Sequence, residues 1–113
     1  MKRQSFLMLV AALVMSAALG AQPVASSVAD AAAKGDKAAV QKLLKDGADV
    51  NGSQGDGMSA LHWAAERGDG ELADMLIYAG ANIGAVTRIG QYTPLHLAAK
   101  SGNVAVAKAL IKA

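Results

Sequence analysis

The chain has 113 residues, a formal net charge of +2 and no cysteine. This length suits one compact domain, and the lack of thiols excludes disulfides, thiolate nucleophiles and cysteine-bound zinc. Hydrophobic residues make up 53% of the chain but aromatic residues only 4%, so a core of large aromatic side chains is excluded as well. Small aliphatic side chains dominate instead, and they favour short helices that pack closely.

The first twenty residues have the pattern of a secretory signal peptide. Lys2 and Arg3 precede an uncharged apolar run that begins at residue 6, and small residues follow up to Gly20. The apolar run covers about 14 residues at its longest, fewer than the roughly 20 that a membrane-spanning helix needs. We therefore predict a leader at 1–20, cleaved after Gly20, and a short lead at 21–25. The mature protein is expected in the periplasm or outside the cell, with no stable membrane span.

Cleavage of this leader changes the charge balance. Loss of Lys2 and Arg3 from the eleven basic residues leaves nine, and the nine acidic residues all lie beyond the leader. A mature chain with a net charge near zero lacks the basic surface that nucleic-acid binding requires. Nucleic acid is therefore not expected as a partner.

One sequence unit occurs three times in the rest of the chain. The segment LHWAAERG at 61–68 occurs again 34 residues later as LHLAAKSG at 95–102. A weaker copy, VADAAAKG at 28–35, lies 33 residues before the segment at 61–68. A period of this length is typical of a solenoid, in which each unit buries its apolar face against its neighbours.

Each unit predicts a helix, a tight turn, a second helix and a projecting turn. Hydroxyl side chains suit the starts of the first helices, paired alanines allow close helix packing, and glycines suit the helix ends. The expected caps are Ser26, Ser59 and Thr93. Second helices are expected at 37–45, 70–78 and 104–112, and turns or short hairpins at 48–58 and 81–92. The second turn is one residue longer, which is expected to push Tyr92 outward.

The motif Thr93-Pro94-Leu95-His96, followed by two alanines, resembles the signature of the ankyrin-repeat family. The resemblance covers residues 26–113, with units at about 26–58, 59–92 and 93–113. It implies an all-α, ankyrin-repeat solenoid of about three helix-turn-helix units with projecting turns. It also implies an exported, non-catalytic module that binds, protects or inhibits a partner protein of the cell envelope, and we expect it to be a monomer.

His62 and His96 are the only histidines, and imidazoles can serve acid–base or metal chemistry. They occupy equivalent places in successive units, where the family uses this side chain to hydrogen-bond the capping hydroxyl and nearby backbone. Two histidines without a clustered cysteine or carboxylate also make a poor zinc site. We expect no catalytic residue, no metal and no cofactor. The alternatives are a hydrolase-type enzyme that uses these histidines and a degenerate fragment with no independent role.

The resemblance places partner contacts at positions that the family leaves variable, in the turns and on the first helices. These positions are Asp56, Met58, Glu66, Arg67, Arg88, Ile89, Tyr92, Lys100 and Ser101. They mix charged, aromatic and apolar side chains, as protein-binding surfaces do. Trp63 is a further candidate because tryptophan often anchors interfaces, although its equivalent, Leu97, indicates a packing position.

Overall fold

The computed structural model describes residues 27–113. The predicted leader, its cleavage after Gly20 and the lead at 21–25 therefore lie outside the described residues. Within 27–113 there are six helices and, besides them, one isolated β-bridge between Ser53 and Ser59. The helices are α2 (Val28–Ala33), α3 (Lys37–Lys45), α4 (Ala60–Arg67), α5 (Gly70–Tyr78), α6 (Pro94–Ser101) and α7 (Val104–Lys112).

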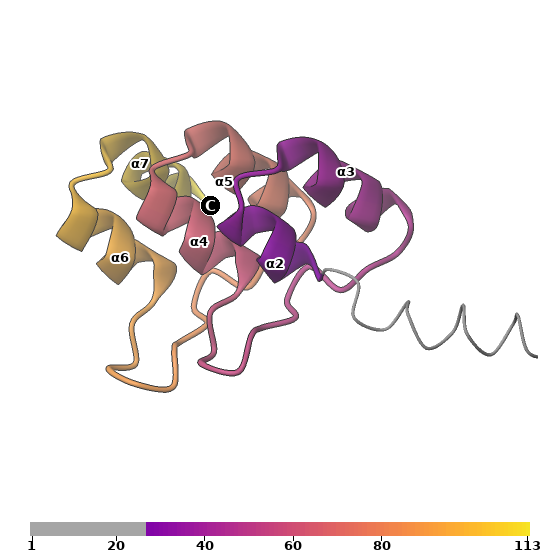
Figure 1. Cartoon of the computed structure of the whole chain (residues 1–113). Helices are drawn as coiled ribbons and strands as arrows, with labels where there is room; N and C mark the ends of the chain where they lie inside the picture. The colour runs from indigo at the N-terminus through magenta and orange to yellow at the C-terminus, as the bar shows by residue number, and fades with distance from the viewer. Residues whose placement is uncertain (1–26) are drawn as a thin grey trace, which may run out of the picture.

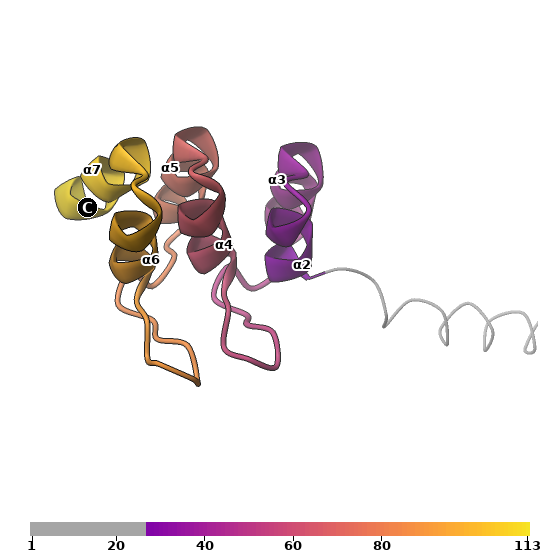
Figure 2. The same cartoon turned by 60° about the vertical axis from the view of Figure 1, so that its left-hand side comes forward.

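The helices form successive pairs that stack side by side (Figure 1). The first helices α2, α4 and α6 make one layer, and the second helices α3, α5 and α7 make the other. α4 packs against both α2 and α6. The two long loops between the pairs project on the side away from the second helices (Figure 2). This arrangement confirms the predicted all-α solenoid of about three units, and the second helices begin and end at the predicted residues.

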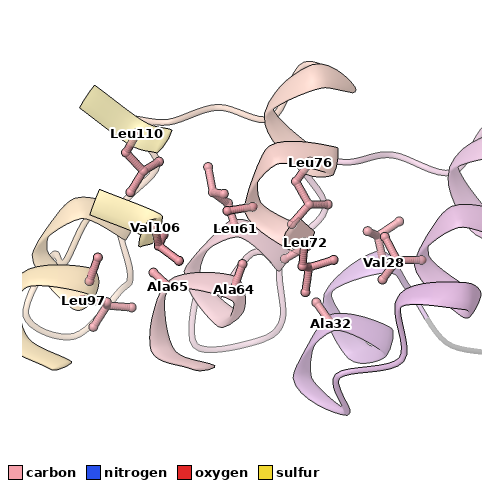
Figure 3. Packing of buried hydrophobic residues seen from close by; sticks show 14 of the residues in the cluster. Val28, Ala32, Leu61, Ala64, Ala65, Leu72, Leu76, Leu97, Val106 and Leu110 are labelled. Atoms are coloured by element: carbon pink, nitrogen blue, oxygen red, sulfur yellow. The ribbon is translucent and has the colours of Figure 1, made fainter. Parts of the chain in front are cut away.

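The core runs through the stack as a line of aliphatic side chains (Figure 3). Leu61, Leu72 and Leu76 are fully buried in the central unit, and so are Ala64 and Ala65 on α4. Because α4 lies between two neighbouring first helices, a larger side chain in place of either alanine would push the units apart. The alanine pairs are therefore what allows the units to pack closely.

The first helices begin and end as the sequence predicts in the second and third units. The hydroxyls of Ser59 and Thr93 accept the backbone N–H three residues later, and Pro94 occupies the first turn of α6. α4 and α6 end at Gly68 and Gly102, whose φ angles of 70° and 71° lie in the left-handed region. These glycines release the chain into the tight turn before the second helix.

The first unit differs from the prediction, because Ser27 and not Ser26 caps α2. The Ser27 hydroxyl accepts the N–H of Asp30 at 3.1 Å, and the Asp30 carboxylate accepts the N–H of Ser27 at 3.3 Å. This reciprocal pair is a capping box. An alignment of the units on Gly35, Gly68 and Gly102 places this cap at Ser26. The cap is Ser27 instead, because it lies one residue closer to its glycine than the caps of the later units do. Asp30 therefore takes the place that histidine holds in those units.

Hydrogen bonds hold the pKa of the Asp30 carboxyl below its ordinary value, chiefly the bond that Gln54 donates at 2.8 Å and then the N–H of Ser27. A lowered pKa means that folding favours the ionised form, so this stabilisation is present at neutral pH and is lost as the pH falls below about 4. We expect Asp30→Asn to lower the melting temperature at pH 7 by about 4 °C.

Thermal melts followed by circular dichroism test this expectation. The difference between Asp30→Asn and the parent chain should be smaller at pH 3 than at pH 7, because the stabilisation by the ionised carboxylate is lost progressively as the pH falls below about 4. Asp74→Asn, at an exposed position of α5, serves as the control and should melt with the parent at both pH values. A difference that stays constant across this pH range would contradict the role assigned to the ionised carboxylate.

Candidate functional site

The two projecting loops are short hairpins, as predicted. In the first hairpin, residues 49–58, the Gln54 N–H donates to the Met58 carbonyl at 3.0 Å, and the Asp56 carboxylate accepts the Met58 N–H at 3.0 Å. In the second hairpin, residues 82–92, Thr87 and Tyr92 are paired. The Thr87 N–H donates to the Tyr92 carbonyl, and the Thr87 hydroxyl accepts the Tyr92 N–H, both at 3.0 Å.

The extra residue of the second hairpin is accommodated at its tip. Gly90 and Gln91 follow one another with φ angles of 85° and 51°, both in the left-handed region. Tyr92 is 37% exposed, so it faces outward only in part. Its ring meets the His96 ring edge-on, with 6.1 Å between centroids, and the Lys100 ammonium lies 5.2 Å from its centroid. The Tyr92 ring is therefore positioned by α6.

The two hairpins are joined to each other by Arg88. Its backbone N–H donates to the Asp56 carbonyl at 2.9 Å, and its guanidinium donates to the Gly55 carbonyl at 2.9 Å. Gly57 lies against the backbone of Thr87 and Arg88 in the second hairpin, where a Cβ atom would come within 2.9 Å of the Arg88 nitrogen. The hairpins thus form one continuous surface.

A hollow of about 260 Å³ lies between the hairpins and α6, and we call it the hairpin hollow. Its lining is mostly apolar and includes one acidic residue. The lining residues are Asp56, Met58, Thr87, Ile89, Tyr92 and Leu97. Four of the predicted contact residues are brought together here, and Lys100 lies over the Tyr92 ring beside them. The Ile89 side chain is 84% exposed.

Of the other predicted contact residues, Arg88 joins the two hairpins, and three lie away from the hollow. Glu66, Arg67 and Ser101 are exposed at the C-terminal ends of α4 and α6, the ends away from the hairpins. The Arg67 guanidinium donates to the Ala33 carbonyl at 3.1 Å, so it joins α4 to α2. The structure therefore gathers the hairpin residues into one site, with Lys100 beside it, and leaves Glu66, Arg67 and Ser101 outside it.

Trp63 is half-buried and packs against the core. Its indole N–H donates to the Gln54 side-chain oxygen at 3.0 Å, and the Gln54 amide donates to the Asp30 carboxylate. This chain of side chains connects α4, the first hairpin and α2. The packing role therefore accounts for Trp63, while a contact with a partner stays a prediction.

Sequence reasoning missed three residues that shape this region. Thr87 is buried, and its hydroxyl also donates to the Ile89 carbonyl at 2.9 Å, which sets the backbone of the second hairpin. Leu97 was placed in the core as the equivalent of Trp63, and it also lines the hollow. Gln54 connects two units, but nothing in a single loop sequence marks it for that role.

The histidines make the hydrogen bonds that the family resemblance implies. His62 Nδ1 accepts the Ser59 N–H at 3.1 Å and lies 2.9 Å from the Ser59 hydroxyl, and its Nε2 donates to the Tyr92 carbonyl at 2.8 Å. His96 repeats the cap with Thr93, at 3.2 Å and 3.0 Å, but its ring is exposed. His62 therefore joins the start of α4 to the end of the second hairpin, and its tautomer follows from this network.

Two further observations concern only residues 27–113. They contain no group of three or more histidine, aspartate or glutamate side chains placed to hold a metal ion. No helix in that range is long and apolar enough to cross a membrane.

Comparison with known proteins agrees with this geometry. The family described as ankyrin repeats in three copies matches residues 28–113, so the chain belongs to the ankyrin repeat family. Ankyrin repeats mediate protein–protein interaction, and proteins built from them are generally not enzymes.

Three relatives are similar to part of this chain. Ankyrin repeat domain-containing protein 40 of Mus musculus is 37% identical over 78 residues, and the protein of the same name of Homo sapiens is 36% identical over 78 residues. The RelA-associated inhibitor of Mus musculus is 36% identical over 83 residues. These matches cover 68%, 68% and 74% of this chain but only 22%, 21% and 10% of the relatives. The chain thus matches about a fifth or less of their length.

Proposed function

We propose that this chain is an exported, non-catalytic binding module that holds a partner protein of the cell envelope against the hairpin hollow and so protects or inhibits it. The observation that carries the proposal is the exposure of Ile89 beside a hollow lined by Met58, Tyr92 and Leu97. An exposed isoleucine adds little to the core, whereas a partner that covers it removes apolar surface from water.

The chemistry of the hollow supports a protein as its occupant. Interfaces commonly have an apolar centre and a polar rim. Here the apolar lining lies next to the Asp56 carboxylate, and the Lys100 ammonium lies over the Tyr92 ring. One relative is named as an inhibitor associated with RelA, which shows that similar repeats occur in a protein named for an inhibitory association. Export is supported by the charge and apolar pattern of residues 1–20.

The test is capture from source cells that express the full chain with a C-terminal tag. We expect the tagged chain in the envelope fraction, together with a co-purifying protein that mass spectrometry identifies. The double variant Ile89→Glu with Tyr92→Ala should weaken capture of that protein by about tenfold to a hundredfold, since interface anchors commonly contribute this much. Circular dichroism should show unchanged helix content.

Ile111→Glu provides the matched control, because Ile111 is 71% exposed on α7 and is not among the residues of the hollow. It introduces the same change of isoleucine to glutamate and should leave capture intact. Arg67→Glu is less suitable, since its guanidinium supports the contact between α4 and α2. Full capture by the hairpin variant, equal loss in the control, or a tagged chain found only in the cytosol would each contradict the proposal.

A further inference from the structure

The second helices are not evenly spaced. α5 and α7 pack closely, and a Cβ atom at Gly70 would lie 3.1 Å from the Cβ of Ala105. α3 stands apart from α5 instead (Figure 2). A groove of about 680 Å³ lies between them, which we call the α3–α5 groove. It lies in the layer of second helices, away from the hairpins.

Two ion pairs join α3 to the start of α5 beside the α3–α5 groove. The Lys37 ammonium on α3 lies 2.8 Å from the Glu71 carboxylate and 3.5 Å from that of Asp69, at the start of α5. The hydrogen bond with Glu71 is the main reason why the pKa of Lys37 is raised. These contacts join the start of α3 to the start of α5. Lys37 is the one lysine among the residues that line the groove, and its ammonium is paired in this way.

The rest of the groove combines negative charge with an exposed aromatic ring. Asp74 and Tyr78 lie one helical turn apart on α5, with the half-buried Met75 beside them. The Tyr78 side chain is 94% exposed. This region holds three carboxylates, those of Asp69, Glu71 and Asp74, and one ammonium, that of Lys37, so its net charge is −2. α3 contributes only neutral side chains here besides Lys37.

The repeat itself shows that this chemistry is not needed for the stack. On α7, the positions equivalent to Glu71, Asp74 and Tyr78 hold Ala105, Lys108 and Lys112. On α3 they hold Ala38, Gln41 and Lys45. The same helix-turn-helix unit therefore forms with alanine, lysine or glutamine in these places. The two carboxylates and the tyrosine are particular to α5, beside the open groove.

We propose that the α3–α5 groove is a second docking site, which binds an arginine-bearing segment of a partner protein. A guanidinium can stack on the Tyr78 ring and donate two parallel hydrogen bonds to the Asp74 carboxylate, one turn away. The aliphatic stem of the same arginine can cover Met75. This site goes beyond the proposed function, because it is separate from the hairpin hollow and shares no lining residue with it.

The probe is the peptide acetyl-Gly-Arg-Leu-Arg-Gly-amide, titrated into the ¹⁵N-labelled protein. We expect the backbone amide resonances of α5 around Asp74 and Tyr78 to shift, and those of the hairpins to remain unchanged. The lysine version should bind at least threefold more weakly, since an ammonium cannot form the paired bonds, and the glutamate version should not bind. Absence of a shift, or shifts confined to the hairpins, would overturn the proposal.

Two substitutions copy residues that α7 already carries at the equivalent positions, so the fold should accept them. Asp74→Lys and Tyr78→Lys should each weaken binding of the arginine peptide by about tenfold. Glu66→Lys makes the same change of charge as Asp74→Lys on the other layer and should leave binding unchanged. Equal weakening by Glu66→Lys would show that net charge alone acts, which would overturn the site.

The hairpin variant Ile89→Glu with Tyr92→Ala separates this inference from the proposed function. It should lose capture of the envelope partner and still bind the arginine peptide with the parent affinity. Loss of peptide binding in this variant would contradict the independence of the two sites.

Discussion

His62→Ala is expected to lower the free energy of unfolding by about 3 kcal/mol, whereas His96→Ala should cost only about 1 kcal/mol. The His62 side chain is 0% exposed and bonds both its own cap residue, Ser59, and the Tyr92 carbonyl at the end of the second hairpin. Removal of the imidazole leaves a void in the stack. It also leaves the Ser59 N–H and the Tyr92 carbonyl without this hydrogen-bond partner. Within residues 27–113, the side-chain hydrogen bonds of His96 are those of the cap with Thr93, and the residue is exposed, so its loss resembles the loss of an N-cap.

Urea denaturation followed by circular dichroism measures both values on the same scale. The two substitutions are chemically identical and differ in the burial of the ring and in the bond to Tyr92, so each is the control for the other. Equal losses would contradict a role for the bond to Tyr92. If either variant kept its stability but lost a measurable activity, the enzymatic alternative would gain support.

Gly57→Ala is expected to destabilise the protein by about 2 kcal/mol or more and to weaken partner capture. Gly57 has a φ angle of 85°, which costs a residue with a side chain about 1 kcal/mol. In addition, its Cβ would lie 2.9 Å from the Arg88 nitrogen and 3.1 Å from the Thr87 Cα. These are backbone atoms that cannot rotate away, so the hairpins must separate and the bond from Arg88 to Asp56 must lengthen.

Gly47→Ala is the matched control for this substitution. Gly47 has a φ angle of 88°, but a Cβ there would have nothing within 4 Å. The control should therefore lose only about 1 kcal/mol and keep its partner. The same denaturation and capture measurements apply to both variants, and equal effects would show that close approach of the hairpins has no energetic role.

The sequence predicted the second helices well because their limits depend on local chemistry. Each follows a turn glycine with a positive φ angle, and Asp36 and Asp69 cap the first two through their carboxylates. The start of α2 was placed one residue too early, because alignment to the later units assumed equal helix lengths. The capping box of Ser27 and Asp30, visible in the sequence, is the stronger signal.

The candidate site was predicted only in part, for a physical reason. The hairpin positions that the family leaves variable include Asp56, Met58, Ile89 and Tyr92, and these four residues do meet at the hollow. Whether a polar side chain faces solvent or bonds a neighbouring unit depends on contacts more than thirty residues apart in the chain, such as that of Arg67 with the Ala33 carbonyl. The spacing of α3 from α5 is likewise set by packing between units, so the pattern of one unit does not predict the groove.

The bridge that Arg88 makes between the two hairpins has a consequence for the kinetics of recognition. Both loops are held to each other before any partner arrives, so little conformational entropy remains to be lost on association. Docking onto such a preorganised surface is limited mainly by diffusion and orientation. Substitutions among the apolar residues of the hollow should therefore act mostly on how long the complex lasts and much less on how fast it forms.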